Sequence, residues 1–328
     1  MNIQSSSPTS PKAVAAESRQ RPRVGTDSKE TSPREPLFIH PDQFRPNSYF
    51  FGRDDELKEL HKLLTDRKKR EDGTSAVLIQ SLPGGGKTHL ARQYVFRHRN
   101  DYPGGIYWIR AKSLQEMTND FWQIAKNEAL RELVFEKGVK KKDLQDPSNM
   151  VDLVRTWFKS FDEWLIVFDG IYFDHPGVQS FIPDHPNTAL IFTSTESAVT
   201  GSHVFNSPRI IRLPLLSTQE AQELLLQEME KKKPWTQDDL SRALEAVELM
   251  GRLPLMIHAA AQHLKATREP LSKYLRSFKT RPKVGGLLAY QGVREQLQHR
   301  GETAALNLMY MLSFFGQRIP VELLGLGK

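Results

Sequence analysis

The feature that most constrains the fold of this chain is the stretch SLPGGGKTHLA at residues 81–91. An apolar run, SAVLIQS, leads into it, and the following KTHLARQYVFRH has apolar residues at helical spacing. We therefore predict a buried strand, a tight turn and a helix in direct succession. The glycines at 84–86 allow successive backbone N–H groups to point inward, and the positive end of the helix adds to them. A turn of this kind is suited to binding phosphate.

The loop matches the phosphate-loop pattern G-x-x-x-x-G-K-[ST] at every position except the first, where Ser81 replaces glycine. Lys87 can reach the β- and γ-phosphate oxygens of a nucleotide, and Thr88 can bind Mg²⁺. Because the later residues of the loop form most of the anion nest, we expect nucleotide binding to survive Ser81. Pro83 removes one N–H donor and stiffens the loop. The candidate nucleotide-binding residues of this segment are Pro83, Gly84, Gly85, Gly86, Lys87, Thr88 and His89.

Further apolar runs alternate with helical patterns after this loop. The runs are GGIYWIRA at 104–111, EWLIVFDG at 163–170, NTALIFTST at 187–195 and RIIRLPLL at 209–216. Ser113 and Glu116 have capping-box spacing for a helix that reaches about Leu133, and SNMVDLVRTWFKS predicts another helix. Strands that alternate with helices indicate an α/β fold. We predict a P-loop NTPase domain at 47–215, with a parallel sheet and helices on both faces.

The remaining segments lack this alternation. Residues 1–46 are rich in Ser, Pro, Arg and Glu, so we predict a disordered tail there. A small helical domain is expected at 216–284, where Ser217 and Glu220 form a second capping box. The segment 285–328 contains only a few further helices, and we interpret it as the start of a third domain.

Asp169, which closes the run WLIVFD, is a second candidate site residue. An acid at the C-terminal end of a buried strand beside the P-loop strand is well placed to hold hydrated Mg²⁺. Hydrolysing P-loop ATPases often have a second acid directly after the first, but Gly170 follows here and the nearest acid is Asp174. The sequence therefore shows no evident general base. Thr193, in the run FTST, either approaches the γ-phosphate or is an ordinary polar residue at a strand end.

Two other features have ordinary explanations in the residues alone. The run GRLPL at 251–255 is typical of a helix start, because proline suits the first helical turn. The scattered histidines lack the spacing of a metal site, and we interpret them as surface or core residues; they include His61, His89, His98, His258 and His263.

The composition excludes several classes of protein. The 328 residues include no cysteine, so disulfides and thiolate metal sites are ruled out. The N-terminus has no apolar core of a secretory signal, and no apolar run approaches the ~18 residues of a membrane span. The net charge of +7 is divided among short basic runs without interleaved aromatic residues. We expect a cytoplasmic protein with no membrane contact and no specific nucleic-acid partner.

The order of these motifs resembles a known family. FFGRDDEL, LPGGGKT, WLIVFD, IFTST, LPLLSTQEAQELL and GRLPLMIHAAA follow one another as in the NB-ARC domain of STAND-class P-loop NTPases. That domain is the switch module of plant disease-resistance proteins, apoptosome activators and fungal incompatibility-type receptors. The resemblance covers about 47–328 and implies ADP or ATP as ligand, Mg²⁺, and a winged-helix lobe at 285–328. The site residues that it implies are Phe51, Gly52 and Arg53 against adenine, Gly84–Thr88 around the phosphates, Asp169 and Thr88 at the metal, and Leu253 with Pro254 at the base and ribose.

Departures from the family shape the functional prediction. The family often has an arginine after the fourth strand that senses the γ-phosphate, but Thr195 stands there, and Gly170 stands where a second acid is frequent. The chain also ends before the family's C-terminal histidine motif, so the expected third lobe is incomplete.

We therefore predict a switch that holds ADP or ATP with slow or no hydrolysis. It would act in signalling or in innate-immunity or incompatibility-type responses, by self-association or with an effector or repeat partner. The alternatives are an active ATPase that drives assembly and a nucleic-acid binder built on the winged-helix lobe.

Overall fold

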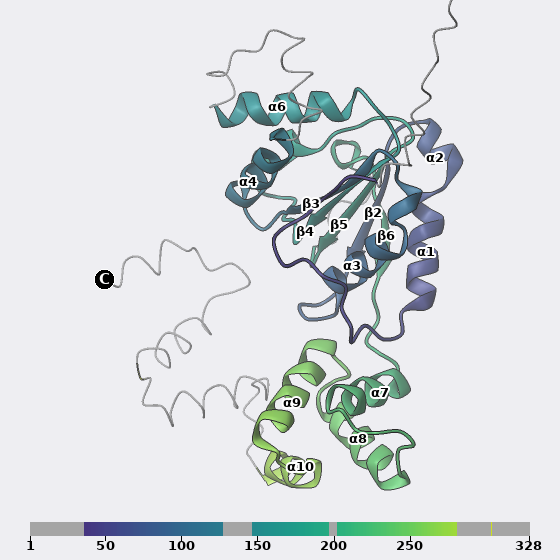
Figure 1. The fold of residues 1–328 in the computed structure, drawn as a ribbon, viewed down its shortest axis with the longest axis vertical. Helices are drawn as coiled ribbons and strands as arrows, with labels where there is room; N and C mark the ends of the chain where they lie inside the picture. The colour runs from purple at the N-terminus through teal and green to yellow at the C-terminus, as the bar shows by residue number, and fades with distance from the viewer. Residues whose placement is uncertain (1–35, 127–145, 197–201, 281–302, 304–328) are drawn as a thin grey trace, which may run out of the picture. The chain divides into compact units, whose positions relative to one another are not determined.

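A computed structural model of the chain describes residues 36–126, 146–196, 202–280 and Thr303 (Figure 1). These residues all belong to one compact unit, Glu35–Lys328. Within the described ranges, no helix is long and apolar enough to cross a bilayer. Apart from Thr303, the predicted winged-helix segment at 285–328 lies outside the described residues.

Six strands form one sheet in which every neighbouring pair runs parallel, as the alternating strand and helix patterns predict. In spatial order the strands are β1 (Phe38–Ile39), β3 (Gly105–Arg110), β4 (Trp164–Asp169), β5 (Ala189–Ser194), β2 (Ser75–Gln80) and β6 (Arg209–Arg212). The central strands are buried on both faces, which explains why they form continuous apolar runs instead of alternating patterns. The predicted α/β fold is confirmed.

The strand order corrects one expectation. We predicted that the strand ending in Asp169 lies beside the P-loop strand, but β5 lies between β2 and β4. An apolar run indicates that a strand is buried and does not specify its neighbour, because a crossover connection can pass over one position. In the observed register Thr193 of β5 pairs with Asp169 on one side and with Ile79 on the other. The hydroxyl of Thr193 is thereby inserted between the P-loop strand and the acid.

The predicted disordered tail, 1–46, is wrong for its last residues. β1 pairs with β3, and Phe44 is buried with its ring centroid 4.6 Å from that of Trp108. The guanidinium of Arg92 lies over the same Phe44 ring at 4.6 Å. Composition averaged over the tail conceals these aromatic anchors, because each buries a large apolar area by itself. Residues 1–35 lie outside the described residues.

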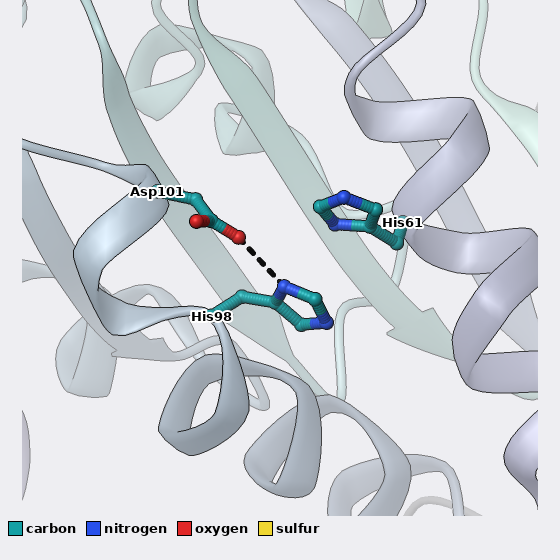
Figure 2. Close-up of side chains that lie close together, drawn as sticks. All are labelled: His61, His98 and Asp101. Carbon is teal, nitrogen blue, oxygen red and sulfur yellow. Dashed lines mark hydrogen bonds and ion pairs between the residues drawn. The ribbon is translucent and has the colours of Figure 1, made fainter.

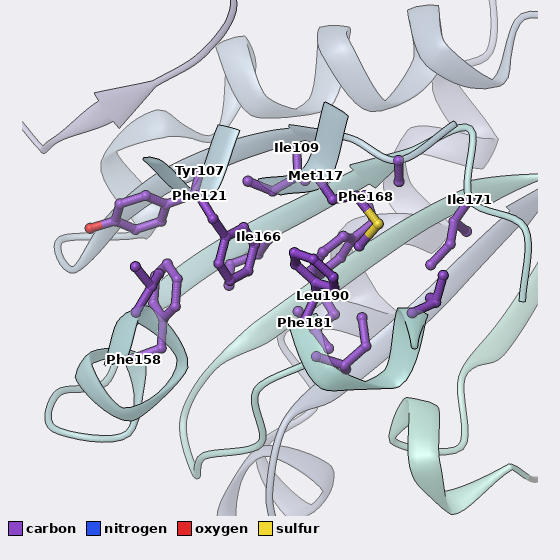
Figure 3. Packing of buried hydrophobic residues seen from close by; sticks show 14 of the residues in the cluster. Tyr107, Ile109, Met117, Phe121, Phe158, Ile166, Phe168, Ile171, Phe181 and Leu190 are labelled. Carbon is purple, nitrogen blue, oxygen red and sulfur yellow. The ribbon is translucent and has the colours of Figure 1, made fainter. Parts of the chain in front are cut away.

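Helices cover both faces of the sheet. One face is covered by α1 (Asp54–Leu64) and α3 (Lys87–Arg97), and the other by α4 (Leu114–Ala125) and α6 (Pro147–Phe158). Successive strand residues such as Leu78 and Ile79 point to opposite faces and join different hydrophobic clusters. Figure 3 shows the cluster under α4 and α6, where Phe121 and Phe158 pack toward Ile166 of β4.

One helix and the end of another differ from the sequence predictions. A five-residue helix, α2 (Arg67–Glu71), occupies a segment for which the sequence analysis predicts no helix. The side chain of Ser113 accepts a hydrogen bond from the Glu116 N–H at the start of α4, as its spacing predicts. That helix ends at Ala125, and the predicted extension to Leu133 reaches 127–145, outside the described residues.

Four helices follow the sheet and share a third hydrophobic cluster. They are α7 (Thr218–Glu228), α8 (Gln237–Leu249), α9 (Pro254–Thr267) and α10 (Leu271–Thr280). The capping box of Ser217 and Glu220 stands at the start of α7, as predicted. Pro254 is the first residue of α9, where its fixed φ suits the helix and its missing N–H costs nothing.

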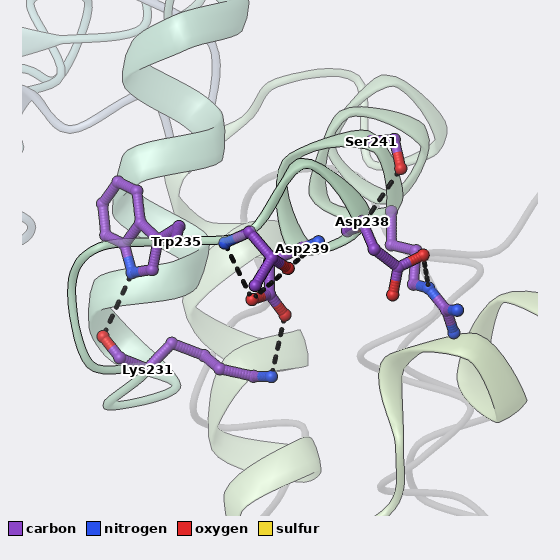
Figure 4. Close-up of polar contacts among 7 residues, drawn as sticks. Lys231, Trp235, Asp238, Asp239 and Ser241 are labelled. Carbon is purple, nitrogen blue, oxygen red and sulfur yellow. Dashed lines mark hydrogen bonds and ion pairs between the residues drawn. The ribbon is translucent and has the colours of Figure 1, made fainter.

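A further capping box, which the sequence analysis did not predict, stands at the start of α8. It joins Thr236 and Asp239, and Lys231 Nζ donates to Asp239 Oδ1 at 2.9 Å (Figure 4). The hydrogen bond from Lys231, supported by those from Thr236, holds the pKa of Asp239 at about 2. Trp235 Nε1 donates to the Lys231 carbonyl at 3.1 Å, which closes the loop between α7 and α8.

Candidate functional site

The glycine loop joins β2 directly to α3, as predicted. Gly84 has a φ of +78° and Gly86 a φ of +97°, and both values lie in the left-handed region that glycine tolerates best. Gly86 occupies the N-cap position of α3 without any side-chain cap, so the first N–H groups of the helix have no side-chain acceptor. Such groups, together with the positive helix end, form an anion site.

Lys87, the first residue of α3, folds back over this loop. Its Nζ donates to the carbonyl oxygens of Ser81 at 2.9 Å and Leu82 at 3.1 Å. Burial lowers the pKa of Lys87, and the charge of Asp169 partly opposes that shift. An anionic ligand on the loop would offer this amine a stronger partner than two neutral carbonyls.

Behind the loop, three polar side chains form one hydrogen-bonded group. Thr88 Oγ1 and Thr193 Oγ1 both donate to Asp169 Oδ1, each at 2.7 Å. The Gly170 N–H in turn donates to Thr193 Oγ1 at 2.8 Å. Hydroxyl and carboxylate oxygens are the hard donors that Mg²⁺ prefers, so Thr88 and Asp169 fit the predicted metal site. Thr193 is fully buried and bonds to Asp169, which favours a supporting role over direct ligand contact.

A pocket of about 450 Å³ opens in front of the loop, within the size range of small-molecule sites. Predicted residues that line it are Phe51, Arg53, Gly84, Gly85, Gly86, Lys87, Thr88, His89 and Pro254. Predicted residues that do not line it are Gly52, Pro83, Asp169, Thr193 and Leu253. Lining residues that sequence reasoning missed are Asn47, Tyr49, Phe50, Leu90, Leu213, Leu216, Leu224, Glu228, Leu255 and His258.

One wall of the pocket is the turn before α1. Gly52 and Arg53 both have left-handed backbone conformations, with φ of +66° and +63°. A Cβ on Gly52 would collide with the Glu220 carboxylate, so this glycine faces α7 and not the pocket. Arg53 is only 7% exposed, and its guanidinium donates to Glu56 Oε1 at 2.8 Å and to the Pro214 carbonyl at 2.5 Å. Arg53 therefore holds the turn in place as well as lining the pocket.

The opposite wall is the start of α9. The Leu255 N–H donates to the Gly84 carbonyl at 3.2 Å, and a Cβ on Gly84 would lie 2.7 Å from Leu255 Cβ. From the residues alone, GRLPL was an ordinary helix start, whereas the family resemblance implied a site. The structure brings Pro254 of this motif to the pocket and leaves Leu253 behind it.

Among the missed lining residues, only some carried a sequence signal. Phe50 directly precedes the predicted FGR turn, and Leu213 and Leu216 belong to the run LPLL. Glu228 and His258 carried none, because they lie on different helices and thirty positions separate them. Their side chains nevertheless form a hydrogen bond of 2.6 Å.

Away from the pocket, three side chains of types that can bind a metal lie close together: His61, His98 and Asp101. His61 of α1 stacks on His98 with ring centroids 4.1 Å apart, and His98 Nδ1 bonds to Asp101 Oδ2 at 2.7 Å (Figure 2). His61 Nδ1 lies 3.2 Å from the Tyr94 hydroxyl, and burial with the nearby His98 lowers the pKa of His61. Stacked rings do not direct their nitrogen lone pairs to one point, and zinc needs nitrogens at about 2.0–2.1 Å. We interpret this group as packing between α1 and the C-terminal end of α3, although its members lie closer together than their spacing in the sequence indicates.

Comparison with known proteins found only distant similarity to solved structures. No protein-family model matches the sequence, and the search of curated proteins found no match. The signal transduction ATPase with numerous domains (STAND) from Pyrococcus horikoshii, which has a tetratricopeptide-repeat sensor, is 17% identical with a TM-score of 0.46. The alignment covers 77% of this chain and 33% of that protein, so the chain spans about a third of its length.

Two further structures are similar at the same level. The Orc1 protein of Aeropyrum pernix, solved in complex with DNA, is 18% identical with a TM-score of 0.45, over 73% of this chain and 68% of that one. The RuvB Holliday junction branch migration motor of Thermotoga maritima is 15% identical with a TM-score of 0.44, over 70% of each chain.

Proposed function

We propose that the chain binds ADP or ATP in the pocket in front of the glycine loop. The observation that carries this proposal is the loop itself, because left-handed glycines, the uncapped start of α3 and Lys87 converge on one pocket wall. The phosphates would lie against Gly84–Thr88. The base and ribose would lie toward Phe50, Phe51 and Pro254, in the more apolar part of the lining.

Thr88 and Asp169 would hold a Mg²⁺ ion that accompanies the nucleotide. When bound, such an ion neutralises phosphate charge and orients the phosphate oxygens. The protein's own contribution is to keep both oxygen donors in place, and the Thr193 hydroxyl helps by bonding to the Asp169 carboxylate.

We further propose that hydrolysis is slow or absent. Gly170 has a φ of +80°, and a Cβ there would lie 3.0 Å from the Lys112 side chain, so an acid at this position would be strained. Asp174 is exposed and does not line the pocket, and neither does Thr195. Within the described residues, neither position 170 nor Asp174 places an acid in the pocket to activate water, and this suits a nucleotide-dependent switch.

In this proposal the chain acts as an NB-ARC-type switch in signalling or in innate-immunity or incompatibility-type responses. Self-association, or an effector or repeat partner, would receive its signal. The Thr88–Asp169 pair is also what a hydrolysing enzyme needs, so an ATPase that drives assembly is the alternative. Whether the chain also contacts nucleic acid is a separate question that a labelled duplex at low salt would answer.

The test is to identify the nucleotide that copurifies with the protein and to titrate ADP into wild type and Lys87→Ala. We expect wild type to bind and Lys87→Ala to lose roughly a hundredfold in affinity or more, because a charge-assisted phosphate contact is removed. Lys58→Ala, which removes a lysine on the exposed face of α1, is the matched control and should bind like wild type. A wild-type protein that ignores ADP would contradict the proposal.

Phosphate release then separates the switch from the ATPase. Turnover below roughly one per minute supports the switch, since typical enzymes run near ~10 s⁻¹. Faster turnover that Lys87→Ala abolishes supports the ATPase.

A further inference from the structure

A buried acid, Glu228, and a half-exposed histidine, His258, form a pair that lines the proposed nucleotide pocket. Neither residue belongs to the glycine loop. Glu228 is the last residue of α7, and His258 lies on α9. His258 Nδ1 bonds to Glu228 Oε2 at 2.6 Å. The Glu228 side chain is 4% exposed and that of His258 is 51% exposed, and both residues line the pocket.

The position of Glu228 is costly for a carboxylate. Burial removes its hydration, and the C-terminal end of α7 carries the negative pole of the helix dipole. An ionised carboxylate only accepts hydrogen bonds, so Nδ1 of His258 carries the hydrogen in this pair. The arrangement leaves Nε2 of the imidazole available to a ligand in the pocket. Such groups in a pocket wall are candidates for ligand contact.

The position of His258 assigns it to the phosphate end of the pocket. It lies three residues after Leu255, on the same side of α9, and the Leu255 N–H donates to the loop carbonyl of Gly84. On the loop side, His89 directly follows Thr88, and both His89 and His258 line the pocket. Burial lowers the pKa of His89, and the charges of Arg92 and His258 lower it further.

We infer that His258 binds a phosphate group of the nucleotide through Nε2, and that Glu228 is the positioning residue that orients its ring. This inference rests on the proposed nucleotide function. It supplies a phosphate contact from α9, beside the glycine loop, and therefore a route by which the phosphates act on the helices after the sheet.

A cationic His258 makes nucleotide affinity depend on pH. The other charged or titratable side chains that line the pocket are Tyr49, Arg53, Lys87, His89 and Glu228. Lys265 of α9 adds a positive charge near Glu228. A protonated imidazole binds an anion more tightly than a neutral one does, so ADP affinity should fall as the pH is raised.

The experiment is calorimetric titration of ADP into the full chain between pH 6.5 and 8.5. The variants are His258→Gln, His258→Arg, Glu228→Gln and His263→Gln. His263→Gln is the matched control, because His263 belongs to another His–Glu pair on the same helix, outside the pocket. Any change in the protonation of ADP itself with pH is the same for wild type and for each variant, so it cancels when they are compared.

We expect His258→Gln to bind roughly ten- to hundredfold more weakly than wild type at low pH and to lose the pH dependence. His258→Arg should keep the affinity with a flat profile, which also shows that the position tolerates substitution. Glu228→Gln should reduce both the affinity at low pH and the size of the fall with pH, because the His258 ring is no longer held in place, and His263→Gln should match wild type.

The outcomes separate the two proposals. Wild type that binds no ADP at any pH overturns the nucleotide function. If wild type binds and Lys87→Ala does not, but His258→Gln keeps the wild-type affinity and profile, the nucleotide function stands and this inference fails. If Glu228→Gln lowers only the melting temperature and leaves the pH profile unchanged, the positioning role of Glu228 is refuted.

Discussion

At the scale of single residues, two glycines show how the same backbone conformation serves different ends. Gly84 and Gly251 have φ values of +78° and +63°. A Cβ on Gly84 would press against Leu255, whereas a Cβ on Gly251 would meet nothing within 4 Å. Gly251 therefore meets only a local conformational need, and Gly84 also permits the close approach of α9 to the loop.

The two glycines provide a matched pair of substitutions. Gly251→Ala should cost about 1–2 kcal/mol of unfolding free energy, because the left-handed conformation is strained for alanine. Gly84→Ala should cost more and should also weaken ADP binding, since α9 must move away from the loop. Chemical denaturation and ADP titration measure both effects. Equal costs with equal affinities would show that the Leu255 contact is unimportant.

Glu220 joins the capping box of α7 to the turn before α1. Burial acts to raise its pKa, but hydrogen bonds from Ser217 and from the Arg53 backbone outweigh that effect and lower the pKa overall. A lowered pKa means that the carboxylate stabilises the fold above its unfolded pKa of about 4.3 and loses this contribution as pH falls through the folded value.

We predict that Glu220→Gln costs about 1 kcal/mol at pH 7, the usual size of a capping interaction. The difference from wild type should close as the pH is lowered below about 4. Denaturation curves between pH 3 and 7 test this, with Glu59→Gln on the exposed face of α1 as control. A difference that does not change with pH would exclude the ionised carboxylate as its source.

At the scale of elements, α3 is tied to the segment after it by two buried tyrosines. The hydroxyls of Tyr94 and Tyr102 lie 2.8 Å apart, and Tyr94 is also 3.2 Å from His61 Nδ1. Burial raises the pKa of both tyrosines, so both stay protonated and able to donate. The hydroxyl of Tyr94 is therefore the link between Tyr102 and α1.

Removal of the two hydroxyls should have unequal effects. Tyr94→Phe takes the hydrogen-bond partner from a buried Tyr102 and should cost about 1–3 kcal/mol, whereas Tyr102→Phe leaves Tyr94 with His61 and should cost less. The double variant should cost less than the sum, because no buried hydroxyl is then left unpaired. Urea denaturation of the four proteins measures this cycle. Additive costs would contradict the coupling.

At the scale of the whole described unit, the pocket is lined by residues from the sheet domain and from the helices that follow it. The glycine loop and the turn before α1 belong to the sheet and its covering helices, whereas Glu228, Pro254 and His258 belong to the helices that follow. A ligand bound in this pocket would contact both groups of elements and link their stability.

We therefore predict that ADP stabilises the two groups together. At a hundredfold excess over its dissociation constant, ADP should add about 2.7 kcal/mol to the unfolding free energy. Amide hydrogen exchange should slow at the start of α9 as well as in α3, and Lys87→Ala should abolish both effects. Protection that is confined to α3 would show that α9 does not close the pocket.

Much of this arrangement could be predicted because its causes are local. Each central strand is buried on both faces and reads as an apolar run, and the glycine loop needs its own backbone conformations. The capping box of α7 likewise depends on two residues three positions apart. The segment that contains Phe38 and Phe44 is held in place by contacts with residues far along the chain, so its own composition predicted a disordered tail.

The sequence by itself therefore determined the central strands, most of the helices, the phosphate-type loop and the acid at the end of β4, because neighbouring residues produce them. Only the tertiary structure decided that β5 lies between β2 and β4, that Glu220 meets the turn at Gly52, and that Glu228 and His258 face the loop. These contacts join residues far apart in the chain. Their energies come from packing and desolvation, which no local pattern records.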